Sequence, residues 1–354
     1  MSAGLKRVLY LSIYGPCISP SQRFRIEQFL PHLQAAGIHF RQYSYFSNAI
    51  TGSNINALPW YKALWHLSLG YVRMWRGVFM ARHYQAVFIQ RELCPFGPPL
   101  HEWVLHYILQ KPFIYDFDDA VWLSAHAKYS LRHVLKCTWK TAWQLKHAHK
   151  VIAGNRYLLN YAQAFNTHAL YIPTVLPQTA QSITPGRKPI TIGWTGSYTT
   201  LPYLLALEPV LLTLQHKYPI RILVICNSKP PFKNLQYEYR PWNAETEIQD
   251  VAELDIGLMP QPDTAWTRGK CGFKLIQYMA LGICPVASTN AVHLDLLNNG
   301  AAGCLCTTPT QWQHTLQHLI ENPEWRYSLG QHAKARQQAM FSTAAHIINV
   351  ISVF

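Results

Sequence analysis

The amino-acid sequence predicts an α/β protein with two doubly wound domains, each built on a parallel sheet. Short apolar runs alternate with helix-like stretches along the chain, which is typical of parallel strands joined by crossover helices. This pattern stops in a stretch rich in Pro, Ser and Thr between residues 174 and 189, and then begins again. The chain has 354 residues, of which 49% are apolar, and this is enough for two hydrophobic cores.

The first half contains the strands and helices expected of one such domain. Residues 7–13 form an apolar run that ends at a Gly-Pro turn, and residues 21–36 follow with apolar side chains at helical spacing. Gly37 is placed to end this helix in the left-handed conformation. The further strands that we expect are 39–45, 86–90, 112–116, 151–153 and 169–172, and the further helices are 102–109 and 156–165.

The second half repeats this alternation, beginning with a strand at residues 190–194. A Gly-containing turn follows the strand, as in the first half. The further strands that we expect are 220–226, 256–259 and 284–287, and the helices are 201–216, 244–253 and 273–281, with more helix after Thr308.

The domain boundaries follow from these elements. We expect a first domain over residues 1–175, a linker over 176–189 and a second domain over 190–335. A C-terminal helix over 336–354 is expected to pack back on the first domain. Two such domains place the carboxyl ends of their strands on either side of a cleft, and open α/β sheets bind ligands at that edge. The cleft is therefore where functional residues are expected.

Positive charge is concentrated in the first half of the chain. Residues 1–180 contain 18 Lys and Arg against 6 Asp and Glu, a net of +12, whereas residues 181–354 contain 13 against 11, a net of +2. Basic surfaces attract nucleic acid, anionic lipid headgroups and phosphorylated ligands. No RNA-recognition or helix-turn-helix signature accompanies the charge, so nucleic acid is not an expected partner.

The cysteine pattern and the hydropathy favour a cytoplasmic protein. The eight cysteines form no C-x-x-C pair and no zinc-ligand spacing, and Cys226 lies in an apolar run, as a buried thiol does. Unpaired thiols suit a reducing compartment. The N-terminus lacks the apolar segment of a signal peptide, and no uncharged apolar run reaches the roughly 18 residues that a spanning helix needs.

The strongest sign of a ligand site is a basic, glycine-containing stretch directly before the expected helix 273–281. Arg268, Lys270 and Lys274 place three cations within seven residues. Glycines allow the backbone to come close to a ligand, and the N–H groups at a helix start favour an anion. The stretch predicts a diphosphate site, with a solvated basic loop as the alternative. The residues that we assign to it are Arg268, Lys270, Cys271, Gly272, Phe273 and Lys274.

A second glycine-containing turn follows the strand that opens the second half. Its sequence is Gly193-Trp194-Thr195-Gly196-Ser197. Small residues give backbone amides access to a phosphate, and Thr195 and Ser197 add hydroxyl donors. We assign Gly193, Thr195, Gly196 and Ser197 to donor binding, although a turn that serves packing alone has the same pattern.

Several of these segments together resemble a known family, the family 4 glycosyltransferases. Residues 255–260 (Asp-Ile-Gly-Leu-Met-Pro), 269–274 (Gly-Lys-Cys-Gly-Phe-Lys) and 278–288 (Tyr-Met-Ala-Leu-Gly-Ile-Cys-Pro-Val-Ala-Ser) resemble its donor-binding half. Residues 21–25 (Ser-Gln-Arg-Phe-Arg) and 173–174 (Pro-Thr) resemble its N-terminal half. The resemblance implies the GT-B fold, with two Rossmann-like domains facing across a cleft. It also implies an N-terminal domain that binds the acceptor, a C-terminal domain that binds a nucleotide sugar, and transfer with retention of anomeric configuration.

The chain departs from the family at two glutamates that normally lie eight positions apart. Gly269 and Gln277 occupy those positions here. Gln277 can still hydrogen-bond a ribose, so we assign it to donor binding. Gly269 has no side chain, which leaves Lys270 or a water to contact the donor sugar. The departure supports a second interpretation, a catalytically impaired nucleotide-sugar-binding or scaffold protein of the same fold.

The acceptor side is expected at the end of a strand in the first half. Asp118 and Asp119 follow that strand, and a carboxylate there can orient an acceptor hydroxyl and take its proton. Asp116 and Asp118 also match the Asp-x-Asp pattern by which GT-A glycosyltransferases hold a divalent metal, and capping of a following helix is a third interpretation. Arg91 and Glu92 follow a neighbouring strand, either facing the cleft or forming a surface ion pair.

Residues 60–82 combine aromatic side chains with cations. Lys62, Arg73, Arg76 and Arg82 alternate with tryptophans, a tyrosine and a phenylalanine. Basic amphipathic helices with Trp suit a membrane interface, and an ordinary helix that packs on the sheet with its cations outward is the alternative. The first interpretation predicts peripheral binding to the inner face of a membrane.

These observations together predict a retaining, hexosyltransferase-type enzyme. It moves a sugar from a nucleoside diphosphate sugar to a hydroxyl acceptor in the biosynthesis of a surface polysaccharide or glycolipid. Arg268 and Lys270 stabilise the departing diphosphate in place of a metal, so no metal and no cofactor is expected. The expected partners are the nucleotide-sugar donor, a glycan or lipid-linked acceptor and an anionic membrane surface.

Overall fold

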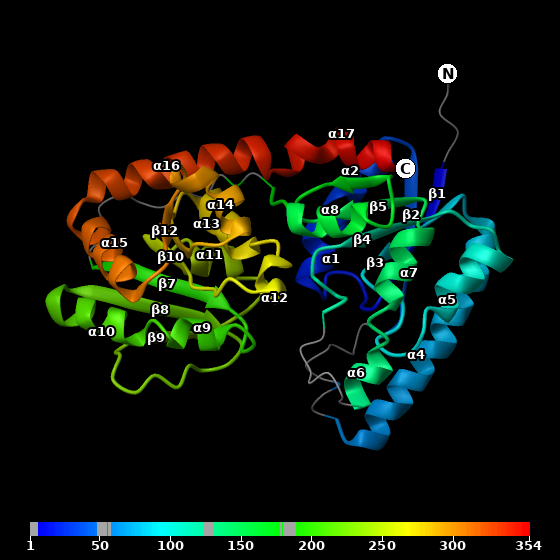
Figure 1. Cartoon of the computed structure of the whole chain (residues 1–354), viewed down its shortest axis with the longest axis horizontal. Helices are drawn as coiled ribbons and strands as arrows, with labels where there is room; N and C mark the ends of the chain where they lie inside the picture. The colour runs from blue at the N-terminus through cyan, green and yellow to red at the C-terminus, as the bar shows by residue number, and fades with distance from the viewer. Residues whose placement is uncertain (1–5, 48–54, 56–57, 124–130, 178, 180–188) are drawn as a thin grey trace. The chain divides into compact units, whose positions relative to one another are not determined.

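The chain folds into two compact units, each with its own sheet. The computed structural model describes residues 6–47, 55, 58–123, 131–177, 179 and 189–354. Unit 1 comprises Met1–Thr174, Gly269–Cys271 and His346–Phe354, and unit 2 comprises Val175–Arg268 and Gly272–Ala345. Each unit has a six-stranded sheet of parallel strands with helices on both faces (Figure 1). The predicted α/β class is confirmed.

The sheet of unit 1 has the strand order β2-β1-β3-β4-β5-β6. The strands are β1 Lys6–Ser12, β2 Ile38–Ser44, β3 Ala86–Gln90, β4 Phe113–Phe117, β5 Lys150–Ala153 and β6 Ala169–Tyr171. The central strands are apolar on both faces because helices cover both, as the buried side chains of β3 and β4 show. The order reverses between β1 and β3, and doubly wound sheets bind ligands at the carboxyl ends of the strands beside such a switch point.

The helix predicted over residues 21–36 is wrong as a single helix. The structure has α1 Pro20–Arg25, a 3₁₀ turn Glu27–Phe29 and α2 Leu30–Ala35. Ile26 leaves the helical region with φ −134°, and Pro31 lacks the N–H that a continuous helix would need. Gly37 has φ +81° and ends α2 in the left-handed region, as predicted.

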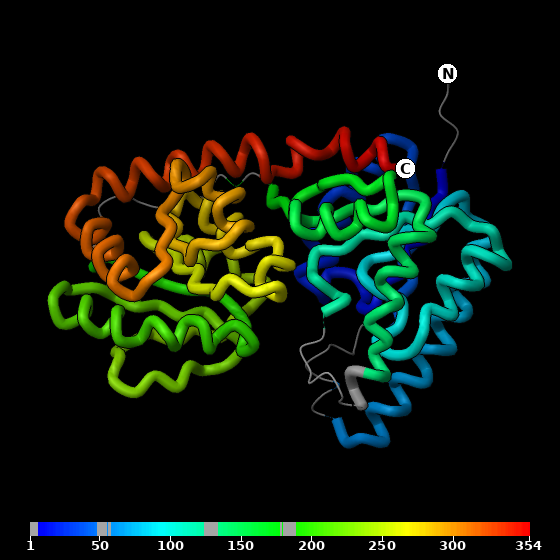
Figure 2. The backbone as a smooth tube through the Cα atoms, in the orientation of Figure 1, coloured from blue at the N-terminus to red at the C-terminus, as the bar shows by residue number. Residues whose placement is uncertain are grey.

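The longest helix of the described chain is α4, Trp60–Met80 (Figure 2). Its buried face consists of Gly70, Met74, Gly77 and Val78, and the two glycines allow close approach because a Cβ at either would overlap Tyr45 or Tyr43. The helix predicted over 102–109 is instead α5 Leu100–Trp103 followed by a π-helix over Val104–Ile108. The remaining helices of unit 1 are α6 Leu131–Lys136, α7 Lys140–His147 and α8 Arg156–Gln163.

The sheet of unit 2 has the order β12-β11-β10-β7-β8-β9, and its switch point lies between β7 and β10. The strands are β7 Ile190–Gly196, β8 Ile220–Cys226, β9 Glu238–Pro241, β10 Ile256–Met259, β11 Cys284–Ser288 and β12 Cys304–Cys306. Sequence patterning did not predict β9 or β12. β9 is an edge strand whose four residues are exposed or half-buried, and β12 has only three residues. Neither therefore has an apolar run long enough to predict a strand.

The helices of unit 2 follow the predictions in part. The helix predicted over 244–253 is the shorter α11 Glu247–Val251, and α12 Ala265–Arg268 and α14 Ala291–Leu296 were not predicted. The predicted helix 201–216 is divided into α9 Leu201–Leu205 and α10 Glu208–Lys217, because Pro209 favours a new helix start. α13 Phe273–Leu281 has the predicted bounds. The other helices are α15 Pro309–Glu321 and α16 Pro323–Met340.

The C-terminal segment contains two helices rather than one. α16 ends at Met340, and α17 Thr343–Val353 follows after a break. The last residues belong to unit 1, where the Lys150 Nζ donates to the carbonyl oxygens of Ser352 (3.0 Å) and Val353 (2.9 Å). Most of the linker predicted over 176–189 lies outside the described residues.

Candidate functional site

Two of the four residues predicted for the turn after β7 serve packing instead. A Cβ at Gly193 would overlap Leu254, so this glycine allows the neighbouring loop to approach the strand. The Thr195 amide donates to the Tyr278 hydroxyl at 3.2 Å, and Thr195 is buried. Thr195 therefore joins the sheet to α13, and Gly193 makes room for Leu254.

The other two residues of the turn lie at the carboxyl end of β7, beside an ammonium group. The Lys274 Nζ lies 4.4 Å from the centroid of the Trp194 ring and donates to the Thr200 Oγ1 at 3.0 Å. A Cβ at Gly196 would come within 2.6 Å of that Nζ. The absence of a side chain at Gly196 thus leaves room for the cation. The Ser197 amide contributes to the same turn, donating to the Thr200 Oγ1 at 3.4 Å.

Lys274 lies in the first turn of α13, whose start depends on a glycine. Gly272 is the N-cap residue, with φ +63°, and a Cβ there would also overlap Leu296. Phe273 is the first helical residue. The positive end of the α13 dipole and the Lys274 ammonium both favour an anion at the carboxyl end of β7.

Arg268, predicted to bind the diphosphate, is held by a carboxylate of its own unit. Its Nε and Nη2 donate to Asp263 at 2.7 and 2.8 Å. This bidentate pair lowers the pKa of Asp263, and both side chains are more than a third exposed. The structure therefore places Arg268 at the surface, paired with an anion.

Gln277 contacts a carboxylate that the sequence patterning did not select. Its Nε2 donates to the Glu247 Oε1 of α11 at 2.7 Å, and both side chains are buried. Gln277 replaces the second glutamate of the family pattern, and Glu247 brings a carboxylate next to that position. The two residues are 30 positions apart, so only the packing of α11 near α13 reveals the pair.

In unit 1, a buried ion pair lies under the ends of β3 and β4. The Arg25 guanidinium donates to both oxygens of Asp116, at 2.5 and 3.3 Å, and to the Ile172 carbonyl at 2.5 Å. Both charged side chains are at most 2% exposed. Burial of this kind requires a full set of partners, which Arg25 and Asp116 supply to each other.

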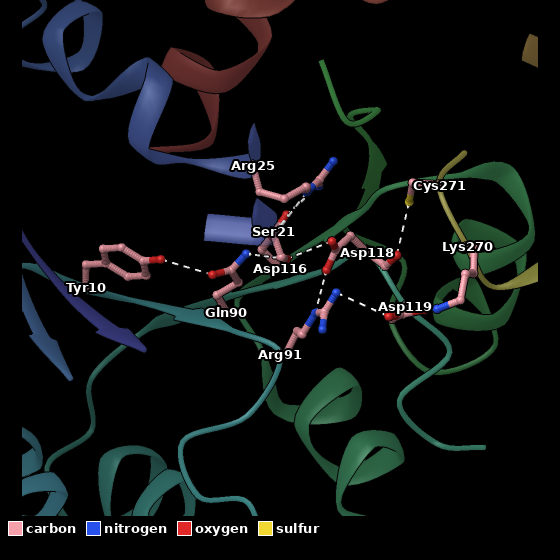
Figure 3. Close-up of polar contacts among 10 residues, drawn as sticks. All are labelled: Tyr10, Ser21, Arg25, Gln90, Arg91, Asp116, Asp118, Asp119, Lys270 and Cys271. Carbon is pink, nitrogen blue, oxygen red and sulfur yellow. Dashed lines mark hydrogen bonds and ion pairs between the residues drawn. The ribbon is translucent and has the colours of Figure 1, made fainter. Parts of the chain in front are cut away.

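Asp118 and Asp119 lie near that pair and share the guanidinium of Arg91 (Figure 3). The Arg91 Nε donates to Asp118 at 2.6 Å and its Nη2 to Asp119 at 3.3 Å. The Ser21 Oγ donates to Asp118 at 2.7 Å, and the Lys270 Nζ to Asp119 at 3.0 Å.

These contacts decide what Asp118 can do chemically. Burial alone would raise its pKa, but the Arg91 guanidinium and the Ser21 hydroxyl lower it to about 2. The carboxylate therefore stays ionised and is a weak proton acceptor at neutral pH. It is suited to orienting a hydroxyl or a cation, and the predicted role of Asp118 as a base is not supported by this geometry.

Arg91 adopts a backbone conformation that is unusual for a residue with a side chain. Its φ is +60°, and its amide donates to the Asp116 carbonyl at 2.7 Å. A non-glycine residue in the left-handed region costs of order 1–2 kcal/mol, so the surrounding contacts must compensate. Arg91 thus pairs with Asp118 and Asp119, whereas Glu92 accepts from the Lys140 Nζ at 2.7 Å, so the alternative of an Arg91–Glu92 pair is wrong.

A chain of neutral hydrogen bonds extends the network to β1. The Gln90 Nε2 donates to the Ser21 Oγ at 2.8 Å, and the Tyr10 hydroxyl donates to the Gln90 Oε1 at 3.0 Å (Figure 3). Sequence patterning selected neither Tyr10 nor Ser21 as a site residue. The sequence feature that could have indicated this network is the position of Gln90 at the end of a buried strand.

The short segment Gly269–Cys271 packs within unit 1. A Cβ at Gly269 would overlap Ala120, so the glutamate of the family pattern does not fit this backbone. The Cys271 Sγ donates to the Asp118 carbonyl at 3.2 Å, and burial raises the pKa of this thiol. Cys271 is therefore a neutral packing residue.

The Asp-x-Asp pattern is not arranged as a metal site. Asp116 is bound to Arg25, and Asp118 to Arg91. Within the described ranges, no group of three or more His, Cys, Asp or Glu side chains is placed to hold a metal ion.

α4 exposes part of its aromatic surface. Trp60, Trp65 and Phe79 are 78%, 67% and 50% exposed, whereas the Tyr71 hydroxyl donates to the Phe96 carbonyl and Trp75 packs against His101. In the part of the chain that the structure describes, no helix is both long and apolar enough to cross a membrane.

Comparison with solved structures finds GT-B glycosyltransferases. Sucrose-phosphate synthase from Thermosynechococcus elongatus has a TM-score of 0.73 and 14% identity, with 98% of each chain covered. Anabaena HepE in complex with UDP and glucose has a TM-score of 0.67 and 12% identity, over 98% of this chain and 99% of that one. WaaG, a glycosyltransferase involved in lipopolysaccharide biosynthesis, has a TM-score of 0.61 and 12% identity, over 97% and 99%.

These likenesses show the fold, which is GT-B as predicted. The sequence itself matches no protein-family model and no curated protein.

Proposed function

We propose that this protein is a retaining glycosyltransferase that moves a sugar from a nucleoside diphosphate sugar to a hydroxyl acceptor. The observation that carries the proposal is the position of the Lys274 ammonium, which lies at the start of α13 and beside the carboxyl end of β7 in unit 2. The GT-B fold supports it, because the neighbours of that fold include HepE in complex with UDP-glucose.

Unit 2 binds the diphosphate in this proposal. Lys274 supplies a fixed charge, the α13 dipole adds to it, and Gly196 leaves room for the ammonium group at the carboxyl end of β7. Charge on the diphosphate grows as the glycosidic bond breaks, so cations held in place stabilise the departing group. Arg268 and Lys270 are the further cations that we propose for it. Each now pairs with a carboxylate, so we expect each to contribute less than Lys274.

Unit 1 binds the acceptor in this proposal. Arg91 orients both Asp118 and Asp119, so their carboxylate oxygens can accept hydrogen bonds from an acceptor hydroxyl. Since Asp118 is a weak base, its role is orientation. The exposed tryptophans and the cations of α4 favour a lipid-linked acceptor at an anionic membrane. WaaG acts in lipopolysaccharide biosynthesis, which supports an acceptor of that class.

Ligand-induced stabilisation tests the donor assignment. Thermal unfolding is measured with UDP-glucose, UDP-galactose and GDP-mannose and with the free diphosphates. A ligand at 100 times its dissociation constant adds roughly 2.7 kcal/mol of stability. Lys274→Met should weaken the binding of the best ligand by about tenfold or more, since charge-assisted contacts contribute about 1.5–3 kcal/mol each. Lys217→Met, an exposed lysine of the same unit, is the matched control.

Two further measurements separate the finer proposals. Transfer should survive a chelator, because protein cations take the place of a metal in this proposal; loss with recovery on adding manganese would contradict metal independence. The anomeric configuration of the product, read by NMR, tests retention.

A non-catalytic binding protein is the second candidate, favoured by Gly269 and Gln277 at the positions of the family glutamates. Binding of a nucleotide sugar without either transfer or slow hydrolysis of the donor would identify it.

A further inference from the structure

The turn that follows β11 contains two buried polar atoms without partners. Asn290 and His293 are 2% and 1% exposed. The Asn290 Oδ1 caps α14 by accepting from the His293 amide at 2.9 Å, but its Nδ2 has no hydrogen-bond partner among the described residues. The Nε2 of His293 has none there either. Buried polar atoms are nearly always paired, so two such atoms in one turn call for a partner that the described residues do not supply.

The protonation of His293 follows from its other nitrogen. The Nδ1 lies 2.6 Å from the Ser288 carbonyl oxygen, which can only accept, so Nδ1 carries the proton. Burial lowers the pKa of His293 to about 4, and the ring is neutral at physiological pH. Its Nε2 is therefore a hydrogen-bond acceptor, whereas the Nδ2 of Asn290 is a donor.

The turn lies at the carboxyl edge of the unit 2 sheet, where the Lys274 ammonium also lies. β11 is paired with β10 and ends at Ser288. Asn290, the N-cap residue of α14, follows two residues later. α14 packs against the N-cap of α13, because a Cβ at Gly272 would meet Leu296. The charges of Asp263 and Lys274 both act on the His293 ring. The unpartnered atoms thus belong to the neighbourhood of Lys274.

We propose that the Nε2 of His293 and the Nδ2 of Asn290 bind hydroxyl groups of the nucleotide sugar, an inference that rests on the proposed function. A hydroxyl can donate to the ring nitrogen and accept from the amide. Diphosphate oxygens carry no proton at neutral pH and would face the lone pair of Nε2 unfavourably. The hydroxyls belong either to the ribose or to the transferred sugar.

Two variants remove one atom each while keeping the turn. His293→Asn retains a donor near the position of Nδ1 for the Ser288 carbonyl but lacks Nε2. Asn290→Ser retains an oxygen that caps α14, since Ser is a good N-cap residue, but lacks Nδ2. His293→Gln places an amide near the position of Nε2 and serves as the rescue variant. His314→Asn, an exposed histidine on α15, is the control.

Calorimetric affinities for UDP-glucose and UDP test the proposal, with GDP-mannose and GDP as a second pair. His293→Asn and Asn290→Ser should each lose about tenfold in affinity, because a ligand hydroxyl is left without its partner. Loss for the nucleotide sugar alone assigns the transferred sugar, and equal loss for the free diphosphate assigns the ribose. In the parent protein, the deoxy analogue that lacks the bonded hydroxyl should bind equally weakly. In His293→Asn, the same deoxygenation should cost nothing further.

Unchanged affinity in both variants, with the parent protein binding its ligand, would overturn the inference and leave the donor assignment intact. Equal losses for every deoxy analogue, without rescue by His293→Gln, would also overturn it, since a general distortion has that effect. If the parent protein bound none of the four probes, the proposed donor class itself would be wrong, and the inference with it.

Discussion

At the scale of single residues, the chain concentrates its unusual chemistry at strand ends. Arg91 has a left-handed backbone and holds two carboxylates, and Lys274 lies over an indole ring beside a glycine. In the first arrangement the guanidinium stabilises the negative charge of the carboxylates. In the second, the indole ring stabilises the positive charge of the ammonium group. The strand ends of unit 1 therefore hold fixed carboxylates, and the carboxyl end of β7 in unit 2 holds a fixed cation.

The strain at Arg91 can be measured by comparing two truncations. Arg91→Gly and Arg91→Ala both remove the guanidinium, but only Ala retains the Cβ that is unfavourable at φ +60°. We expect Arg91→Gly to be the more stable variant by roughly 1 kcal/mol, although Gly elsewhere is the more costly residue. Urea unfolding of the two variants checks this order. A higher stability for Ala would mean that the backbone relaxes once the ion pairs are gone.

Two buried histidines predict how stability depends on pH. Burial lowers the pKa of both His101 and His293 to about 4, whereas an exposed histidine titrates near 6.5. As the pH falls below about 6.5, the unfolded chain binds protons that the folded chain does not, so stability falls between pH 6.5 and 4. Each histidine accounts for up to about 3 kcal/mol of this loss. Above pH 7 it contributes no pH dependence.

Urea unfolding between pH 4 and 7.5 measures this slope for each unit. His101→Phe, which keeps a ring against Trp75, should flatten the slope for unit 1, and His293→Asn should do so for unit 2. The exposed His314→Asn variant should keep the slope of the parent protein. An unchanged slope in all variants would mean that other groups control the acid sensitivity.

At the scale of elements, helix packing in unit 2 depends on contact between two glycines. A Cβ at Gly330 in α16 would overlap the carbonyl oxygen of Gly282, which ends α13 with φ +74°. α13 carries Lys274, so this contact also supports the anion site. The same packing explains why a glycine is present in the middle of a helix, where it is otherwise unfavourable.

Gly330→Ala therefore sets two effects against each other. Helix propensity alone favours Ala by about 1 kcal/mol, whereas overpacking costs about 1–3 kcal/mol. Because the obstacle is backbone and not a flexible side chain, we expect net destabilisation of about 1 kcal/mol, measured by urea unfolding. Ser328→Ala, an exposed change on the same helix, should alter stability by only a few tenths. Stabilisation by Gly330→Ala would show that α16 can move away from α13.

At the scale of the whole molecule, charge is divided unequally along the chain. The first 180 residues carry a net +12, and α4 exposes Trp60 and Trp65 together with Lys62 and, further along the helix, Arg76. Tyr71 and Trp75 pack inward, so the exposed aromatic surface of α4 is smaller than the sequence pattern indicates.

We predict that the protein binds vesicles containing anionic lipid and leaves neutral vesicles unbound. Each Lys or Arg near such a surface contributes about 1 kcal/mol, and the attraction decays within a Debye length of about 8 Å at physiological salt. Cosedimentation should therefore weaken as salt rises. Binding should fall when Lys62, Arg73, Arg76 and Arg82 are all changed to Gln.

The control changes four cations of unit 2, Lys217, Lys229, Lys233 and Lys334, to Gln. It lowers the net charge equally but should leave vesicle binding intact. Equal loss in both quadruple variants would show that total charge, and not α4, causes the attraction.

The sequence by itself determined the α/β class, the two parallel sheets and most strands. These features depend on local apolar runs, turn glycines and helix starts, as Gly37 and the bounds of α13 show. The sequence also indicated Asp118 and Asp119, because they directly follow a predicted strand. It indicated Lys274 because this residue lies in a basic, glycine-containing stretch at a predicted helix start.

Only the tertiary structure decided which of those residues are partners. The contacts of Asp119 with Lys270 and of Gln277 with Glu247 join residues 151 and 30 positions apart. Their side chains meet because the fold packs segments together that are distant in sequence, α11 near α13 in the case of Glu247 and Gln277, and no local pattern encodes such a meeting. The unpartnered Nε2 of His293 is of the same kind, since burial and missing partners are properties of the packed chain alone.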